Sequence, residues 1–298
     1  MKEGKWMAWS LLLALSLIWG SSFILIKKGL VGLSPGEVGA LRILAASLFL
    51  FPFALAQIKK IRLGEWKYLV SVGLLGSLFP SFLFAIAQTR LSSAVTGILN
   101  TLTPLFTLLV AQTAYHHRYG KGVTIGILTG FAGSVVLILA GSGATFQLNA
   151  YAFFVVLATF FYALNLNIIK NHLQRLSSLS ITSVSLLVAG PLAAVYLVVF
   201  TDYSQKIIVT DGMLPASAYI VLLGVLGTAI ALILFNRLVQ LTDPVFTSSV
   251  TYIIPLIAVL WGLLDGEKLY VIHFVGMAAI LVGVFIVNRT SRSKSKDQ

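Results

Sequence analysis

Polar side chains follow one face of an apolar segment near residues 92–112. Thr96, Asn100, Thr103 and Thr107 are spaced 4, 3 and 4 residues apart, which is the periodicity of one helix face. Hydroxyl and amide groups in such a row can hydrogen-bond a solute. For any one of them alone, a hydrogen bond between helices is the competing interpretation.

Similar residues recur in other apolar segments of the chain, and together they favour a polar pathway. Aromatic residues add an apolar wall, although each alone is typical of core packing. The predicted solute-binding residues are Trp19, Ser22, Phe79, Thr96, Asn100, Tyr162, Asn165, Thr228, Thr251 and Tyr252.

Arg42 is the one basic residue inside an apolar segment. An unpaired Arg in hydrocarbon costs at least ~2.5 kcal/mol, so its side chain needs partners. Two interpretations stay open. The side chain extends to the nearby interface or bonds to carbonyl groups at a helix end, with Glu37 as a possible partner, or it forms an anion anchor facing a carboxylate or phosphate.

The chemistry that the sequence lacks is also informative. There is no Cys, and the metalloprotease, nucleophile-elbow and P-loop motifs are absent. The nine acidic residues all lie at the ends of apolar segments or between them. We therefore expect no enzymatic activity, no metal and no cofactor, and no carboxylate proton relay in the middle of a membrane.

Ten apolar stretches must position these residues. Mean hydropathy is +0.97 and only 10% of residues are charged, whereas about 20 apolar residues suffice to cross a bilayer. This composition predicts an all-α polytopic membrane protein with ten transmembrane helices. They are expected at Met7–Lys27 and near 36–56, 67–88, 92–112, 121–141, 149–169, 180–200, 217–238, 245–264 and 270–288.

The net charge of +12 indicates topology and not nucleic-acid binding. With a cytoplasmic N-terminus, 15 Lys and Arg residues fall on the cytoplasmic side and 5 on the outer side. Both termini are therefore expected in the cytoplasm. The basic tail at Arg289–Lys296 is expected to meet the anionic headgroups of the lipid bilayer.

The chain also repeats itself. Leu75-Gly76-Ser77 matches Leu226-Gly227-Thr228, and Pro104-Leu105 matches Pro255-Leu256, at the same offset of 151 residues. We predict two five-helix repeats, 1–143 and 144–298, which enter the membrane in opposite senses because five is odd. Pro104 and Pro255 are either gating points or sources of simple helix curvature. Glycines near 122–133 and 276–283 predict close helix packing.

Several motifs resemble those of EamA-type transporters of the drug/metabolite transporter superfamily. They are Trp19-Gly20-Ser21-Ser22-Phe23, Leu41-Arg42-Ile43 with Ala45-Ala46, Ser93-Ala94-Val95, Pro104-Leu105-Phe106 and Leu264-Asp265-Gly266-Glu267-Lys268-Leu269. The first-half counterpart of the last motif, residues 116–121, has no carboxylate. The resemblance covers residues 5–290 and implies ten helices in two halves.

The resemblance implies a plasma-membrane transporter, in the bacterial inner membrane, that moves a small organic solute such as an amino acid, a metabolite or a drug-like compound. Alternating access at a central cavity and export are expected on the same basis. The alternative is a non-transporting membrane subunit or lipid flippase that partners an enzyme. The oligomeric state is open, with a monomer as the working expectation. Without midplane acids, we expect downhill transport or exchange, with Glu267 supporting its turn.

Overall fold

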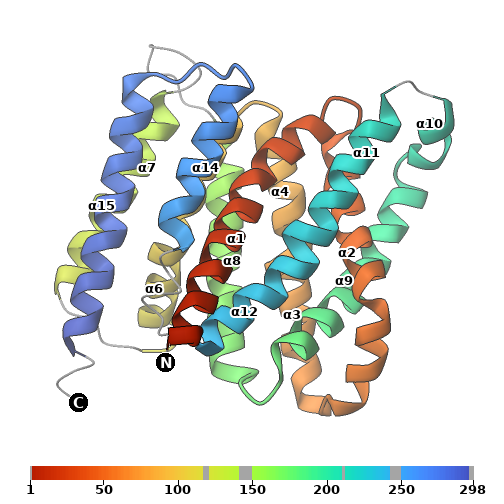
Figure 1. The fold of residues 1–298 in the computed structure, drawn as a ribbon, viewed down its shortest axis with the longest axis horizontal. Coiled ribbons are helices and arrows are strands. Elements are labelled where there is room, and N and C mark those ends of the chain that lie inside the picture. Colours follow the sequence, from red (N-terminus) through yellow and green to blue (C-terminus); the bar gives the residue numbers. More distant parts are fainter. Residues whose placement is uncertain (1, 117–120, 141–149, 210–211, 242–249, 295–298) are drawn as a thin grey trace.

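The computed structural model describes residues 2–116, 121–140, 150–209, 212–241 and 250–294, and these form helices joined by short connections (Figure 1). The helices of the first half are α1 (Lys2–Gly29), α2 (Pro35–Gln57), η1 (Ile58–Lys60), η2 (Leu63–Glu65), α3 (Trp66–Gly73), η3 (Leu74–Leu78), α4 (Phe79–Gln88), α5 (Ser93–Leu99), η4 (Asn100–Leu102), α6 (Thr103–Thr113) and α7 (Lys121–Ala140). Those of the second half are α8 (Ala152–His172), α9 (Ser178–Val199), α10 (Tyr203–Val209), α11 (Met213–Leu222), η5 (Leu223–Ile230), α12 (Ala231–Leu241), α14 (Val250–Leu264) and α15 (Val271–Lys294).

Seven continuous helical segments of the described chain are long and apolar enough to cross a membrane. These are Trp6–Gly29, Pro35–Lys60, Leu63–Gln88, Ser93–Thr113, Ala152–His172, Ser178–Val199 and Met213–Phe235. Three shorter apolar helices cover Gly122–Leu137, Ile253–Leu264 and Val271–Ile286. The predicted all-α polytopic membrane fold is thereby confirmed, while ten crossings and their inverted repeat stay a prediction.

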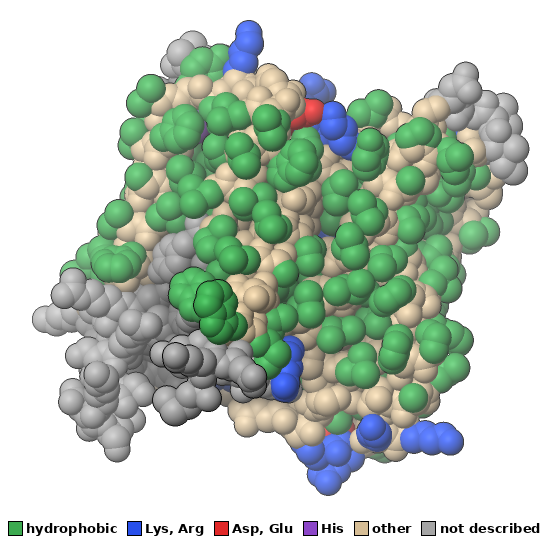
Figure 2. Space-filling model, viewed as in Figure 1, with side chains coloured by type: hydrophobic (Ala, Val, Ile, Leu, Met, Phe, Trp, Pro, Cys, Tyr) green, Lys and Arg blue, Asp and Glu red, His purple; other side chains and the backbone are tan. Residues whose placement is uncertain are grey.

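The surface has the pattern that a bilayer demands. Figure 2 shows hydrophobic side chains covering the middle of one face, with Lys and Arg side chains gathered toward the two ends. Large apolar side chains such as Leu17, Leu48 and Phe285 are more than half exposed. A soluble protein would bury such residues, whereas in a membrane the lipid tails cover them.

The helices lie side by side in one bundle, and α7 pairs with α15 at one edge (Figure 1). Glycines allow this pair to approach closely. A Cβ atom at Gly133 would come within 2.8 Å of the Gly276 carbonyl oxygen, and one at Gly283 within 2.5 Å of the Gly126 carbonyl oxygen. The predicted packing role of these glycines is confirmed, and the contact is within the chain.

The bundle has two ends that matter for the site. The terminal end carries the start of α1, the end of α15 and the connection between α8 and α9 (Figure 1). The far end carries the turn between α1 and α2 and the connection from α14 to α15. Ser34 and Glu37 form a capping box that starts α2 at this far end. Arg42 follows on α2, less than two turns deeper in the bundle.

Candidate functional site

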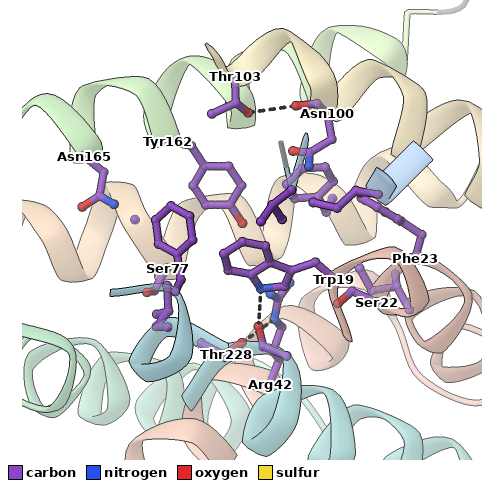
Figure 3. Close-up of a pocket in the computed structure, with 18 of the residues that line it drawn as sticks. Trp19, Ser22, Phe23, Arg42, Ser77, Asn100, Thr103, Tyr162, Asn165 and Thr228 are labelled. Carbon is purple, nitrogen blue, oxygen red and sulfur yellow. Dashed lines mark hydrogen bonds between the residues drawn. The ribbon is translucent and has the colours of Figure 1, made fainter. Parts of the chain in front are cut away.

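A cavity of about 180 Å³ lies in the middle of the bundle (Figure 3). It is bounded by α1, α2, η3, α4, η4, α6, α8, η5, α12 and α14. Its lining mixes aromatic and aliphatic side chains with a few polar groups, which is the usual make-up of a small-molecule site. The polar groups that it brings together are Trp19, Ser22, Arg42, Ser77, Asn100, Thr103, Tyr162, Asn165 and Thr228.

Most of the predicted solute-binding residues with described side chains line this cavity. They are Trp19, Ser22, Asn100, Tyr162, Asn165 and Thr228, joined by the predicted anchor Arg42. The side chains of Thr251 and Tyr252 lie outside the described part of the structure, although the backbone of both residues belongs to α14. Whether any of these residues binds a solute stays a prediction.

The structure places two predicted residues away from the cavity. Phe79 is 42% exposed, and its ring contacts that of Phe161 with centroids 5.9 Å apart. Thr96 is fully buried, and its hydroxyl donates to the Ser92 carbonyl oxygen at 2.9 Å. The row of polar residues is thus divided, because Asn100 and Thr103 line the cavity whereas Thr96 does not.

Arg42 turns into the cavity and not toward the interface. Its side chain is only 9% exposed, and Nε donates to Thr228 Oγ1 at 2.9 Å (Figure 3). The Tyr162 hydroxyl is its other polar neighbour. The suggested Glu37 partner is wrong, because the Glu37 carboxylate accepts from the Ser34 backbone N–H at 2.7 Å and lies 3.8 Å from the Lys206 ammonium.

Two π-helical segments provide part of the cavity wall. η3 contributes Gly76 and Ser77, and η5 contributes Gly227 and Thr228. π-Helical turns are rare and occur frequently at functional sites, because the wider turn redirects the side chains within it. Trp19 Nε1 donates to the Gly227 carbonyl oxygen at 3.1 Å, which ties α1 to η5 (Figure 3).

Helix packing explains how Arg42 reaches Thr228. A Cβ atom at Gly224 would lie 2.5 Å from the Arg42 carbonyl oxygen. Only a glycine therefore allows η5 to approach the backbone of α2 this closely. The guanidinium on α2 and the hydroxyl on η5 are brought together by this contact.

The segment from α5 to α6 changes its winding where it meets the cavity. Pro104 has no N–H to donate to the carbonyl oxygen of Asn100, four residues earlier. That oxygen instead accepts from the Thr103 hydroxyl at 2.9 Å, and residues 100–102 form the short 3-10 turn η4 (Figure 3). The Asn100 side chain consequently lies at a break in the helix, where it lines the cavity.

The side-chain oxygens of Asn100 and Asn165 are buried and have no hydrogen-bond partner. Asn165 packs directly over Gly76, where a Cβ atom would lie 2.6 Å from its side-chain Cγ. Buried polar atoms are normally paired, so these two cavity-lining oxygens are available to a ligand or water.

The two ends of the cavity differ. A smaller cavity of about 50 Å³ shares Gly76, Ser77 and Asn165 with the main one. It continues toward the terminal end, where Val72 and Ile169 line it. The smaller cavity therefore extends the main cavity toward the terminal end.

Toward the far end, charged groups connect neighbouring helices. Lys27 Nζ lies 2.8 Å from Asp265 Oδ2 and 2.9 Å from Glu267 Oε1. Glu267 also accepts the backbone N–H groups of Ser93 at 2.8 Å and Ala94 at 3.1 Å. We call Lys27, Lys28, Asp265 and Glu267 the far-end cluster. It joins α1, α5 and the connection after α14.

Sequence analysis missed several lining residues, including Phe23, Gly76 and Ser77. A signal for Ser77 was present, because the 151-residue offset that pairs it with Thr228 makes both equally good candidates. Phe84 and Phe235 are paired by the same offset, and both line the cavity. Phe23 carries no such signal, because an aromatic residue in an apolar helix is typical of core packing.

Fold and site define a polytopic α-helical membrane protein with a small central cavity that aromatic and aliphatic side chains and a few polar groups line. The profile of the EamA-like transporter family matches residues 6–139 and again 149–289. The chain therefore belongs to the EamA-like transporter family, as its motifs indicated, and is a membrane transporter.

Relatives with known names agree with this assignment. The chain is 25% identical over 282 residues to the "uncharacterized inner membrane transporter YedA" of Escherichia coli K12, covering 93% of this chain and 89% of the relative. It is 26% identical over 284 residues to an "uncharacterized transporter" of Archaeoglobus fulgidus, covering 94% and 98%. A solved crystal structure matches with a TM-score of 0.65 at 17% identity, over 96% of this chain and 98% of that chain, and shows the fold alone.

Proposed function

We propose that this transporter moves a small organic solute across the bacterial inner membrane by alternating access, and that export is its direction. One observation carries the proposal. Residues paired between the halves line one cavity: Ser77 with Thr228 and Phe84 with Phe235 at the 151-residue offset, and Trp19 with Tyr162 and Ser22 with Asn165 at a second offset of 143 residues. A site at the interface of inverted repeats is common in alternating-access transporters.

The proposed movement uses the interrupted helices. The π-helical segments η3 and η5 contain the paired residues Gly76 and Gly227, and both border the cavity. Pro104 lies further along the chain in α6, and Pro255 lies in α14. Irregular turns absorb changes in backbone angles more readily than regular helix does. In this proposal, the two repeats, 1–143 and 144–298, rock around the cavity while these four positions bend.

The far-end cluster supports one assignment of the conformational state of the transporter. With its ion pairs formed and the smaller cavity extending toward the terminal end, the conformation is the one closed at the far end. The positive-inside rule puts the terminal end in the cytoplasm, so this is an inward-facing state. No Asp or Glu is among the described lining residues, and we therefore propose downhill transport or exchange.

The test uses single cysteines, because the chain has none of its own. Val31→Cys is in the far-end turn and Gly64→Cys is near the start of α3, and Val31 is 84% exposed. In intact cells, a membrane-impermeant thiol reagent should label position 31 and not position 64. The reverse labelling would overturn the proposed orientation.

Transport itself is tested in proteoliposomes that contain the purified protein. Counterflow of a radiolabelled solute panel should proceed without an imposed pH gradient. A Val31→Cys protein labelled with a bulky thiol reagent serves as an orientation marker. Absence of protein-dependent flux for every solute would contradict the transport proposal, and uphill accumulation driven by a pH gradient alone would contradict the uncoupled mechanism.

A further inference from the structure

Basic side chains gather where the chain turns between α2 and α3. We call residues 57–67, which join the apolar spans Pro35–Lys60 and Leu63–Gln88, the basic connection. Its exposed cations are Lys59, Lys60, Arg62 and Lys67. The connection lies at the terminal end, where Figure 2 shows Lys and Arg side chains at the foot of the bundle below α2 and α3. It therefore presents positive charge at one boundary of the membrane-spanning helices.

The acid within the basic connection does not balance this charge. Glu65 accepts from Arg175 of the α8–α9 connection, from Nε at 2.9 Å and from Nη2 at 2.7 Å. It also accepts the backbone N–H of Arg62 at 2.8 Å. Because this carboxylate pairs with a cation from outside the connection, the four cations of the connection stay in excess.

The far end treats its basic residues differently. Lys27, Lys28 and Lys206 each lie within 3.8 Å of a carboxylate oxygen. The cations of the basic connection are thus set apart from these by the lack of an acid partner within the described part of the chain. Charge that the protein leaves unpaired at a membrane boundary is available to an anion there.

Hydrogen bonds fix the backbone of the basic connection. Arg175 Nη2 donates to the Lys60 carbonyl oxygen at 2.8 Å. Gln57 Oε1 accepts from Ser180 Oγ at 2.9 Å and from Lys60 Nζ at 3.0 Å. The connection is thereby held against the start of α9. A backbone that is already ordered loses less conformational entropy when a ligand binds.

Apolar side chains alternate with the cations. Leu63 is 90% exposed and lies between Arg62 and the start of α3. Trp66 is half-buried and packs against a small apolar cluster that includes Leu69 and Leu173. Tryptophan is enriched at the level of the lipid headgroups, and basic segments with exposed apolar side chains lie in the same layer.

We propose that the basic connection binds the headgroup of an anionic phospholipid. Lys59 and Arg62, with the other two cations, bind the phosphodiester, and Leu63 contacts the acyl chains. By the positive-inside rule this end faces the cytoplasmic leaflet, whose anionic lipids attract basic segments. A lipid fits better than a soluble anion, because the site joins positive charge to an exposed apolar side chain. The site is separate from the central cavity, which none of these residues lines.

Fluorescence quenching in nanodiscs tests the site. Gly64→Cys carries the fluorophore, because the chain has no cysteine and a Cβ atom at Gly64 has no neighbour within 4 Å. The bilayer is a fixed mixture of phosphatidylcholine and phosphatidylglycerol, with a nitroxide on the chains of one lipid or the other. Phosphatidylglycerol should be enriched beside position 64 at least about twofold over its share of the bilayer.

A fluorophore at Val31→Cys is the control position, since Val31 is 84% exposed at the far end and the nearby Lys27 and Lys28 are paired. It should report phosphatidylglycerol at its share of the bilayer. Equal enrichment at positions 31 and 64, or none at position 64, would overturn the proposal.

A double variant tests the cations. Lys59→Gln with Arg62→Gln should remove most of the enrichment at position 64. The matched control is Arg90→Gln with Lys268→Gln, which removes one Arg and one Lys from exposed positions at the far end and should leave the enrichment unchanged. Unchanged enrichment in the first variant, or equal loss in both, would contradict a site at the basic connection. Melting temperatures in detergent verify that both variants fold.

Two further measurements separate a lipid from a soluble anion. Glycerol phosphate, added at constant ionic strength, should leave the enrichment unchanged, and its loss would indicate a site for soluble phosphate instead. Leu63→Gln keeps every charge and should lower the enrichment in part, because it removes the apolar contact with the acyl chains. Full enrichment in Leu63→Gln would contradict that contact.

Discussion

Two groups of buried or half-buried charge lie in this molecule, and they differ in whether the protein supplies the opposite charge. In the far-end cluster, Lys27 and Lys28 contact Asp265, and Lys27 also contacts Glu267. At the centre, the described polar neighbours of Arg42 are hydroxyl groups. Charges paired within the chain hold helices together, whereas a cation left unpaired beside a cavity is available to a ligand.

The contrast extends to hydrogen bonds. Glu267 is 3% exposed at its side chain, and its two oxygens accept from Lys27, Ser93 and Ala94. Asn100 and Asn165 at the cavity each keep an oxygen without a partner. The far-end cluster is thus a satisfied network that rigidifies the fold, and the cavity is an incomplete one.

Removing the acid at the centre of the far-end cluster has the largest expected effect. Glu267→Ala leaves two backbone N–H groups at the start of α5 without their acceptor and leaves Lys27 with Asp265 alone. Each buried donor that loses its acceptor costs about 1–3 kcal/mol, so the two backbone N–H groups dominate the expected loss. We expect a large drop in the melting temperature in detergent, measured by intrinsic fluorescence.

Glu65→Ala is the matched control for this prediction. Glu65 pairs with Arg175 at the terminal end, through two hydrogen bonds of 2.9 and 2.7 Å. That pair is solvent-accessible, and surface ion pairs are worth about 1 kcal/mol or less. Equal losses in the two variants would show that burial of Glu267 contributes nothing to stability.

A steric change at the cavity should act on binding more than on stability. In Gly76→Ala, the new methyl group would lie 2.6 Å from the Asn165 side chain, which must move. The end of a side chain yields more easily than backbone, so we expect a stability cost of about 1 kcal/mol. Solute affinity should fall about tenfold, because a misplaced amide loses its hydrogen bond.

Gly64→Ala is the control, since a Cβ atom there has no neighbour within 4 Å. Binding and stability of this variant should match those of the parent protein. If Gly76→Ala binds the solute with unchanged affinity, Asn165 does not contact it.

The smallest predicted effect is a loss of stability in acid. Hydrogen bonds from Lys27 and then Lys28 hold the pKa of the Asp265 carboxyl below its usual value. A carboxyl whose pKa is lower in the folded state stabilises the fold above its unfolded pKa of about 3.9. This contribution is lost as the pH falls through the folded pKa.

The melting temperature should therefore decline below about pH 4. Asp265→Asn should abolish the share of this decline that comes from Asp265, which corresponds to less than about 1 kcal/mol of stability. A profile identical in the parent protein and Asp265→Asn between pH 3 and 6 would contradict this assignment.

Much of the fold could be predicted from the sequence, because a bilayer forces long apolar helices. The α7–α15 pair is an example, since its glycine spacing predicted a close approach that the backbone shows at Gly133 and Gly283. The π-helical segments at Leu74–Leu78 and Leu223–Ile230 could not be predicted. Their residues are as apolar as those of a regular helix, and the wider turn depends on packing between helices.

The candidate site was predicted in part. The internal repeat pointed to residues on both sides of the cavity, such as Ser22 and Asn165. Thr96 shows the limit of helical periodicity, because it shares a predicted helix face with Asn100 and Thr103 but is fully buried away from the cavity. The orientation of Arg42 was also open from sequence, since the choice between interface and cavity depends on Gly224 letting η5 approach α2.

The central claim is that the charge of Arg42 serves solute binding, whereas the charge of Lys27 stabilises the fold. The most direct measurement compares the melting temperatures of Arg42→Gln and Lys27→Gln in the absence of solute. A loss of about 1 kcal/mol in Lys27→Gln should lower its melting temperature by roughly 2–4 °C. Arg42→Gln should melt at the same temperature as the parent protein or higher, because it removes an uncompensated buried charge. A lower melting temperature for Arg42→Gln than for Lys27→Gln would contradict the account.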